Sequence, residues 1–280
     1  MPEIPRRRQA DQASGLRRLF GARTAQIVAF VSTHDSLRRG ADGMPLILKT
    51  AANLIQSEMG VVVMDEHAAA ASVFASFGLK VRKDLLDVVD ARHTASEIVV
   101  EGPSGLRLVG ASRFAVEMSY IDAVAEQRLD SALIELQDGS DFLMLDCAAR
   151  ASGEVSPLAI KAHHVTVMVT PQATAITQAY VQIKHLARMR HGQGIHVLVN
   201  RARNEKEARS VFEKIQMTAF KHLGIQLDFL GCAEALDGDG MGELMRRHAQ
   251  PALASGKPGR PVARPNPEPP PALARLLSVV

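Results

Sequence analysis

Residues 27–32 read Ile27-Val-Ala-Phe-Val-Ser32, an apolar run of the length of a buried strand, and a loop of polar residues and glycines follows them at 33–43. Next come Met44-Pro-Leu-Ile-Leu-Lys-Thr-Ala-Ala-Asn-Leu-Ile55, which predicts a helix, and Gly60-Val-Val-Val-Met-Asp65, a second apolar run that ends in an acid. A strand, a loop, a helix and a strand in this order predict a βαβ unit of a parallel sheet.

The loop can be aligned with the phosphate-binding pattern G-x-x-x-x-G-K-[ST] as Gly43-Met-Pro-Leu-Ile-Leu-Lys-Thr50. Leu48 then occupies the second glycine position, where a side chain prevents backbone N–H groups from closing around a phosphate. Lys49 and Thr50 are candidate nucleotide ligands; the alternative is a solvated helix lysine beside a cap-like threonine. The segment has the frame of an ATPase with a damaged anion cradle.

The composition indicates a chain with a substantial aliphatic core. Of its 280 residues 46% are hydrophobic, whereas aromatic residues make up 4% and tryptophan is absent. Such aliphatic content is typical of buried parallel sheets. Cys147 and Cys232 both lie in apolar segments, so we expect two buried thiols of a cytoplasmic protein. No apolar run reaches the ~18–20 residues of a transmembrane helix.

Basic ends flank an acidic body, and they divide the chain into three parts. The net charge of +3 separates into +4 for an N-terminal arm at 1–23, +3 for residues 251–280 and −4 for what lies between. Eight of the 14 prolines fall in 251–280, which predicts a disordered tail. We expect one domain at 24–250, with no nucleic acid bound by its core. Weak membrane contact of the basic ends stays open.

Strands and helices alternate along this body. Apolar runs predict strands at 27–32, 60–65, 97–101, 106–110, 142–146, 164–170, 195–200 and 227–231. Helical patterns lie at 45–58, 68–77, 118–137, 154–162, 174–190 and 204–223. The alternation predicts an α/β fold with a doubly wound, mostly parallel sheet flanked by helices. Ligands bind such sheets outside the carboxyl ends of the strands.

Polar residues follow four of these strands, and together they carry a resemblance. The strand ends are Asp65-Glu-His67, Asp146-Cys-Ala-Ala149, Thr170-Pro-Gln-Ala-Thr174 and Asn200-Arg-Ala-Arg203, and the chain also contains Asp11-Gln-Ala-Ser-Gly-Leu-Arg17 near its start. In these segments the chain resembles the MinD/ParA-type deviant-Walker ATPases, which have a P-loop NTPase fold. Within that group it is most similar to the flagellar-number regulators of the FlhG/FleN family.

The resemblance implies roles for individual residues. Asp146 would be the Walker B acid that bonds the water shell of Mg²⁺, and Asp65 the first acid after the second strand. Asn200 would reach the adenine edge of ATP, with Pro171 and Thr174 at the same end of the pocket. The N-terminal helix would engage and stimulate a signal-recognition-type flagellar GTPase through Asp11, Gln12, Leu16 and Arg17.

The departures from the family all concern nucleotide chemistry. The family's glycine-rich loop with two lysines is replaced by an insertion with His34 near the first lysine position, and His67 stands where a second acid orients the attacking water. Arg150 occupies a position where a small switch residue is usual. Losing one oriented catalytic group costs about 10²–10⁴-fold in rate. ATP and Mg²⁺ are therefore doubtful cofactors, and Asp146 could instead be a structural remnant.

We expect a regulator of flagellar number or placement, a pseudo-ATPase that acts by binding its GTPase partner in the cytoplasm, at the cell pole or at the inner membrane surface. The alternative is an active MinD-like ATPase switch that dimerises on ATP. Basal-body proteins, transcriptional regulators and a second copy of the chain are further candidate partners. The segment at 11–20 could also be an amphipathic helix that packs on its own domain, because its apolar residues recur at helical spacing.

Overall fold

The computed structural model describes residues 25–117, 122–150, 154–190 and 194–233. The expected arm at 1–23 and the expected tail at 251–280 lie outside these ranges, as does the end of the expected domain after residue 233. Within the described residues, no helix combines the length and the apolar character needed to cross a membrane.

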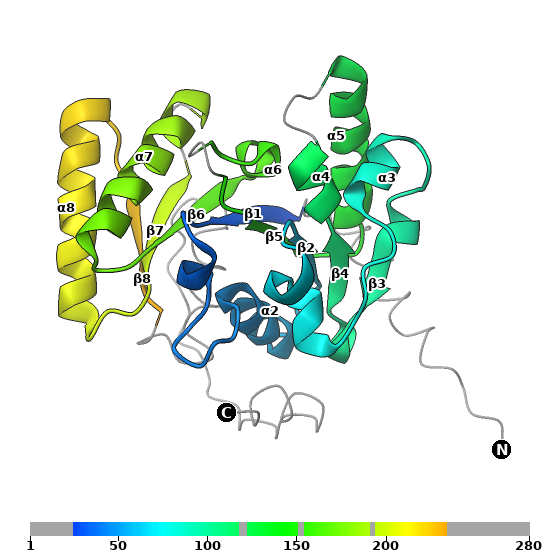
Figure 1. Cartoon of the computed structure of the whole chain (residues 1–280), viewed down its shortest axis with the longest axis horizontal. Helices are drawn as coiled ribbons and strands as arrows, with labels where there is room; N and C mark the ends of the chain where they lie inside the picture. The colour runs from blue at the N-terminus through cyan, green and yellow to red at the C-terminus, as the bar shows by residue number, and fades with distance from the viewer. Residues whose placement is uncertain (1–24, 118–121, 151–153, 191–193, 234–280) are drawn as a thin grey trace, which may run out of the picture.

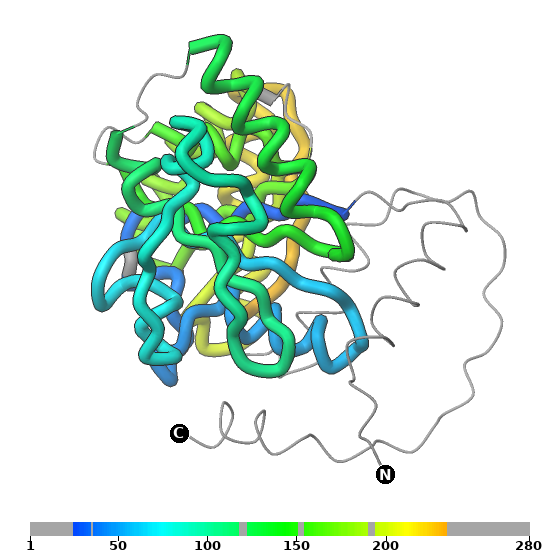
Figure 2. Tube along the Cα trace, turned by 90° about the vertical axis from the view of Figure 1, so that its right-hand side faces the viewer, coloured from blue at the N-terminus to red at the C-terminus, as the bar shows by residue number. Residues whose placement is uncertain are grey.

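Eight strands form one sheet, in the order β3-β4-β2-β5-β1-β6-β7-β8. The strands are β1 Gln26–Val31, β2 Val61–Asp65, β3 Val99–Glu101, β4 Arg107–Gly110, β5 Phe142–Cys147, β6 His164–Val169, β7 Ile195–Val199 and β8 Asp228–Cys232. All neighbours run parallel except β3 and β4, which form an antiparallel pair at one edge. Figure 2 turns this edge toward the viewer. The predicted doubly wound sheet is confirmed.

Helices cover both faces of the sheet (Figure 1). They are α2 Leu46–Gln56, α3 Leu85–Val89, α4 Ser112–Glu117, α5 Ala123–Gln137, α6 Pro157–Lys161, α7 Ala173–Arg190 and α8 Glu205–Leu223. In Figure 1, α2 lies below the sheet and α4 to α7 lie above it. Short 3₁₀ turns are η1 Asp35–Arg38, η2 Ala69–Ala71, η3 Val73–Phe77, η4 Ser96–Ile98 and η5 Pro103–Gly105.

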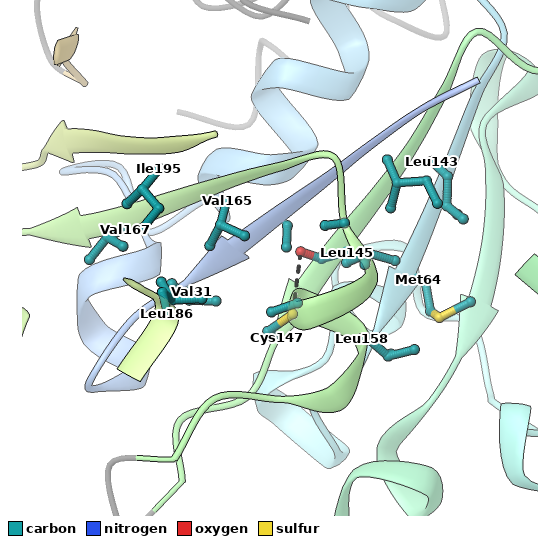
Figure 3. Packing of buried hydrophobic residues seen from close by; sticks show 14 of the residues in the cluster. Val31, Met64, Leu143, Leu145, Cys147, Leu158, Val165, Val167, Leu186 and Ile195 are labelled. Carbon is teal, nitrogen blue, oxygen red and sulfur yellow. Dashed lines mark hydrogen bonds between the residues drawn. The ribbon is translucent and has the colours of Figure 1, made fainter. Parts of the chain in front are cut away.

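The central strand β1 sends alternate side chains into two cores, as the period of two in a strand requires. Ile27, Ala29 and Val31 belong to the core under α3 to α8, whereas Val28 and Phe30 belong to the core that α2 covers. Figure 3 shows part of the first core. β1 is therefore buried on both faces, which explains its continuous apolar run.

Cys147 ends β5 within the first core, and its thiol donates a weak hydrogen bond to the carbonyl oxygen of Leu145 (Figure 3). Burial raises the pKa of this thiol well above its ordinary value. Cys232 is also buried. The expectation of two buried thiols is confirmed.

The predicted helix at 68–77 is wrong. The segment forms the two 3₁₀ turns η2 and η3, and Ser72 between them has extended backbone angles. Ser72 donates its hydroxyl to Asp65 and the next backbone N–H also bonds that carboxylate, so the turn forms around the acid rather than continuing as a helix. The patterns also missed α3 and α4, which are too short to show helical periodicity.

Candidate functional site

Several buried polar side chains lie at the carboxyl ends of strands, and three of them are predicted site residues. Asp65 ends β2, Asp146 is the next-to-last residue of β5, and Asn200 follows β7; each is at most 1% exposed. Asp65 and Asp146 are direct partners in the parallel pairing of β2 with β5. Two carboxylates therefore lie next to each other in the protein interior, where a charge is costly unless it is paired.

The neighbouring cation is Arg38, at the end of η1 in the loop after β1. Its side chain is 1% exposed and its Nη1 lies 3.2 Å from Oδ2 of Asp146, itself 1% exposed. Its Nε donates to Nε2 of His67 at 3.1 Å, and its Nη2 donates to the carbonyl oxygen of Ala71. All three guanidinium nitrogens thus face groups of the site.

His67 lies between Arg38 and Asp65. Its Nδ1 and its backbone N–H are 3.0 and 2.9 Å from Oδ1 of Asp65. Burial lowers the pKa of this imidazole, whereas the bond to Asp65 and the charge of Asp146 raise it more, so the net shift is upward. Because Nε2 accepts a hydrogen bond from Arg38, the single ring proton of His67 lies on Nδ1. The same contact opposes protonation of Nε2.

Asp65 is surrounded by donors. Besides the two bonds from His67, its Oδ2 accepts from the hydroxyl of Ser72 at 2.5 Å and from the backbone N–H of Val73 at 2.8 Å. Both oxygens of this carboxylate thus accept hydrogen bonds. Asp65 therefore organises the turn after β2.

Asn200 fastens the loop that carries Arg38. Its side-chain amide donates to the carbonyl oxygen of Leu37 at 2.7 Å and to that of Arg39 at 2.9 Å. The carbonyl groups of the residues before and after Arg38 are thus bound to one side chain. Arg201 adds a bond from its Nη2 to the carbonyl oxygen of Ser36 at 2.9 Å.

The structure brings Asp65, Asp146 and Asn200 together, but it places the other predicted nucleotide ligands in different contacts. Lys49 in α2 forms an ion pair with Asp42 and is 37% exposed. Thr50 is buried, and its hydroxyl donates to the carbonyl oxygen of Leu46 in its own helix.

Three other residues singled out from the sequence also have clear places. Leu48 belongs to the core that α2 covers. Pro171 follows β6 and is half-buried, and Thr174 lies in the first turn of α7. The residues predicted to activate a partner, Asp11, Gln12, Leu16 and Arg17, lie outside the described residues.

Comparison with solved structures shows the MinD/ParA fold. A chain of the MinC:MinD cell division protein complex from Aquifex aeolicus has a TM-score of 0.57 and 16% identity, over 84% of this chain and 100% of that one. A plasmid partition protein from Borrelia burgdorferi has a TM-score of 0.58 and 13% identity, over 80% and 99%. Identities this low show the fold alone.

Curated relatives narrow the similarity to flagellar proteins. The antiactivator FleN of Pseudomonas aeruginosa is 29% identical over 171 residues, 61% of each chain. The flagellum site-determining protein YlxH of Helicobacter pylori is 24% identical over 187 residues, 66% of this chain and 62% of that one. The chain thus matches about three fifths of the length of these relatives. No family model matches it.

The sequence did not predict Arg38 as a residue of the site. The departure at His67 was visible because the residue interrupts an acidic pair, but Arg38 lies in an insertion between a strand and a helix, among other charged residues. Its contacts come from segments distant in the chain, at His67 and Asp146. A buried arginine in a polar loop carries no local signal, since arginine is almost always exposed unless paired.

Proposed function

We propose that this chain regulates flagellar number or placement by binding other proteins, with a signal-recognition-type flagellar GTPase as its main partner, and that it hydrolyses ATP poorly or not at all. The similarity to FleN and YlxH supports the flagellar role. The second of these relatives is a site-determining protein by name, and the first is an antiactivator, which favours a transcriptional regulator as a further partner.

The single observation that carries the loss of ATP chemistry is the ion pair of Arg38 with Asp146. In P-loop nucleotidases an acid at this strand end faces the magnesium ion and the phosphates. Here the chain's own guanidinium lies 3.2 Å from the carboxylate, and Asn200 binds the loop of Arg38 through its side-chain amide. The residues that would hold a nucleotide hold the loop instead.

The residues present do not fit ATP with Mg²⁺. A phosphate cradle needs glycines whose N–H groups close around the anion, whereas Leu48 of this segment is buried in the core and Lys49 pairs with Asp42. α2 begins at Leu46 after Pro45, which cannot donate a backbone N–H. A bound phosphate would also have to displace Arg38 from Asp146. We therefore assign no step to a nucleotide.

The partner proposal is tested with the whole protein and the flagellar GTPase of the same organism. We expect GTP turnover by the partner to rise when this protein is added. Gln12→Ala and Arg17→Ala should each remove most of the stimulation, because an arginine and a glutamine on a helix suit a partner's phosphate site. Arg8→Ala, outside the expected helix, is the matched control. Unchanged turnover with the wild-type protein would overturn the partner assignment.

The ATP proposal is tested separately by titration with a fluorescent ATP analogue and by phosphate release. We expect no saturable binding at micromolar concentrations and no turnover above the Asp146→Ala variant. Tight binding with turnover that disappears in Asp146→Ala would instead establish the ATPase switch that dimerises on ATP. Analytical sedimentation then measures whether ATP makes the protein dimerise, as the ATPase switch requires.

A further inference from the structure

We propose that Arg38 is a built-in cation that takes the place of a divalent metal ion on the side chains of Asp65, His67 and Asp146. On this proposal the site is complete without a ligand, and removing Arg38 converts it into a metal-ion site. The inference concerns the chemistry of this cluster and holds whichever partner the protein binds.

The first argument is the donor set. Asp65, His67 and Asp146 each offer one ligand atom, these atoms lie within 4.8 Å of one another, and all three residues are buried. Among the residues that the structure describes, no second group of this kind occurs. Two carboxylates and an imidazole are ligands that Mn²⁺ and related divalent ions accept.

The second argument is charge. Two buried carboxylates need compensation, because burying an isolated charge costs several kilocalories per mole or shifts its protonation. While its Nε2 accepts from Arg38, the ring of His67 carries a single proton and no net positive charge. The guanidinium of Arg38 is always protonated, and its side chain is as buried as that of Asp146. A full positive charge is therefore present where a metal ion would otherwise be required.

The third argument is that Arg38 is fixed in this position. Asn200 binds the carbonyl oxygens of the residues on both sides of it. Its guanidinium also donates to the carbonyl oxygen of Ala71 in η2, so the cation joins the loop after β1 to the turn after β2. Arg39, the adjacent arginine, instead donates to carbonyl oxygens, that of Gly43 at 2.8 Å and those of Ala70 and Ala71 at 3.3 Å. Of the two adjacent arginines, Arg38 is therefore the one that pairs with Asp146.

The experiment compares wild-type protein, Arg38→Ala and the matched control Arg39→Ala. We expect Arg38→Ala to lower the Tm by about 10 °C, because it leaves a buried charge unpaired. Arg39→Ala should lower it far less. Millimolar Mn²⁺, or low-millimolar methylguanidinium, should restore most of the Tm of Arg38→Ala and leave the wild-type Tm unchanged.

Calorimetric titration with Mn²⁺ gives a second readout. Arg38→Ala should bind one Mn²⁺ per chain, whereas the wild type and the double variant Arg38→Ala, Asp146→Asn should bind none. If Arg38→Ala does not fold in buffer, it should fold when purified with methylguanidinium; failure of both cations to restore it would overturn the proposal. Mn²⁺ binding by the wild type as tight as by Arg38→Ala would also overturn it, as would equal losses of Tm in Arg38→Ala and Arg39→Ala.

Discussion

Glu66, in the turn after β2, accepts a hydrogen bond from the hydroxyl of Ser156, which caps the N-terminus of α6. The same carboxylate accepts from the backbone N–H of Ala148 at 2.9 Å. Glu66 thus joins the end of β2 to the segment after β5. Burial raises the pKa of Glu66 to about 7, although the bonds from Ser156 and Ala148 oppose the rise.

This raised pKa predicts a pH-dependent stability. Because the folded state binds the Glu66 proton more tightly than the unfolded state, its contribution is fully present below pH 4.5 and is lost as the pH rises toward 7. The loss is bounded by about 3 kcal/mol. Glu66→Gln should therefore gain stability relative to wild type between pH 5 and 8, as measured by urea unfolding. The exposed variant Glu135→Gln is the control, and a pH-independent difference for Glu66→Gln would contradict the prediction.

Asn200→Ala should destabilise the protein by about 2–3 kcal/mol. The substitution removes two donors and leaves the carbonyl oxygens of Leu37 and Arg39 without them. Hydrogen exchange at residues 34–40 should accelerate as well, since the loop loses its attachment. Arg201→Ala, which removes the exposed bond to Ser36, should cost less than about 1 kcal/mol. Asn200→Ala with wild-type stability would show that the loop is held by other contacts.

Asp84 should be more important than an ordinary helix cap. It caps α3 through the N–H of Leu86, and it also accepts from the backbone N–H groups of Arg113 and Phe114 at the start of α4. Asp84→Ala should cost about 2–4 kcal/mol, because two buried donors and one partly buried donor lose their acceptor. Asp122→Ala removes the exposed cap of α5 and should cost about 1 kcal/mol. Similar chemical denaturation midpoints for the two variants would refute this ranking.

Lys49→Ala should change stability by less than about 1 kcal/mol, because its ion pair with Asp42 is partly exposed. Burial raises the pKa of Asp42, but the hydrogen bonds from Lys49 and from the N–H of Met44 together lower it by more than this. The net pKa of Asp42 is therefore below its ordinary value. In Lys49→Ala this pKa should rise, as an NMR titration would show. An unchanged Asp42 pKa would mean that the pair does not form in solution.

The strands could be predicted from the sequence more completely than the helices. All eight strands were predicted to within a few residues, because an apolar run such as that of β5 is dictated by burial on both faces. α3 and α4 were missed, since they depend on the carboxylate of Asp84, which is distant from α4 in the chain. Ala69 has a φ of 51°, which no helical pattern anticipates.

The site could be predicted only in part, because some of its contacts join residues that are distant in the chain. Asp65, Asp146 and Asn200 were found because each ends or follows a recognisable strand. The identity of what they bind depends on Arg38, whose bonded partners are set by tertiary structure. The sequence pattern reveals that a glycine of the phosphate-binding loop is missing. It does not reveal that the side chain of Arg38 lies beside Asp146.

The position of β1 has a consequence for how the chain is made. β1 is the first strand in the sequence, yet both of its neighbours, β5 and β6, come from the second half of the sheet-forming region. Pairings between such distant segments close large loops and form slowly. A nascent or truncated chain that ends before β5 has no native neighbour for either edge of β1. Because unpaired edges of an apolar strand pair with other chains, truncation before β5 should yield aggregates rather than a smaller folded domain.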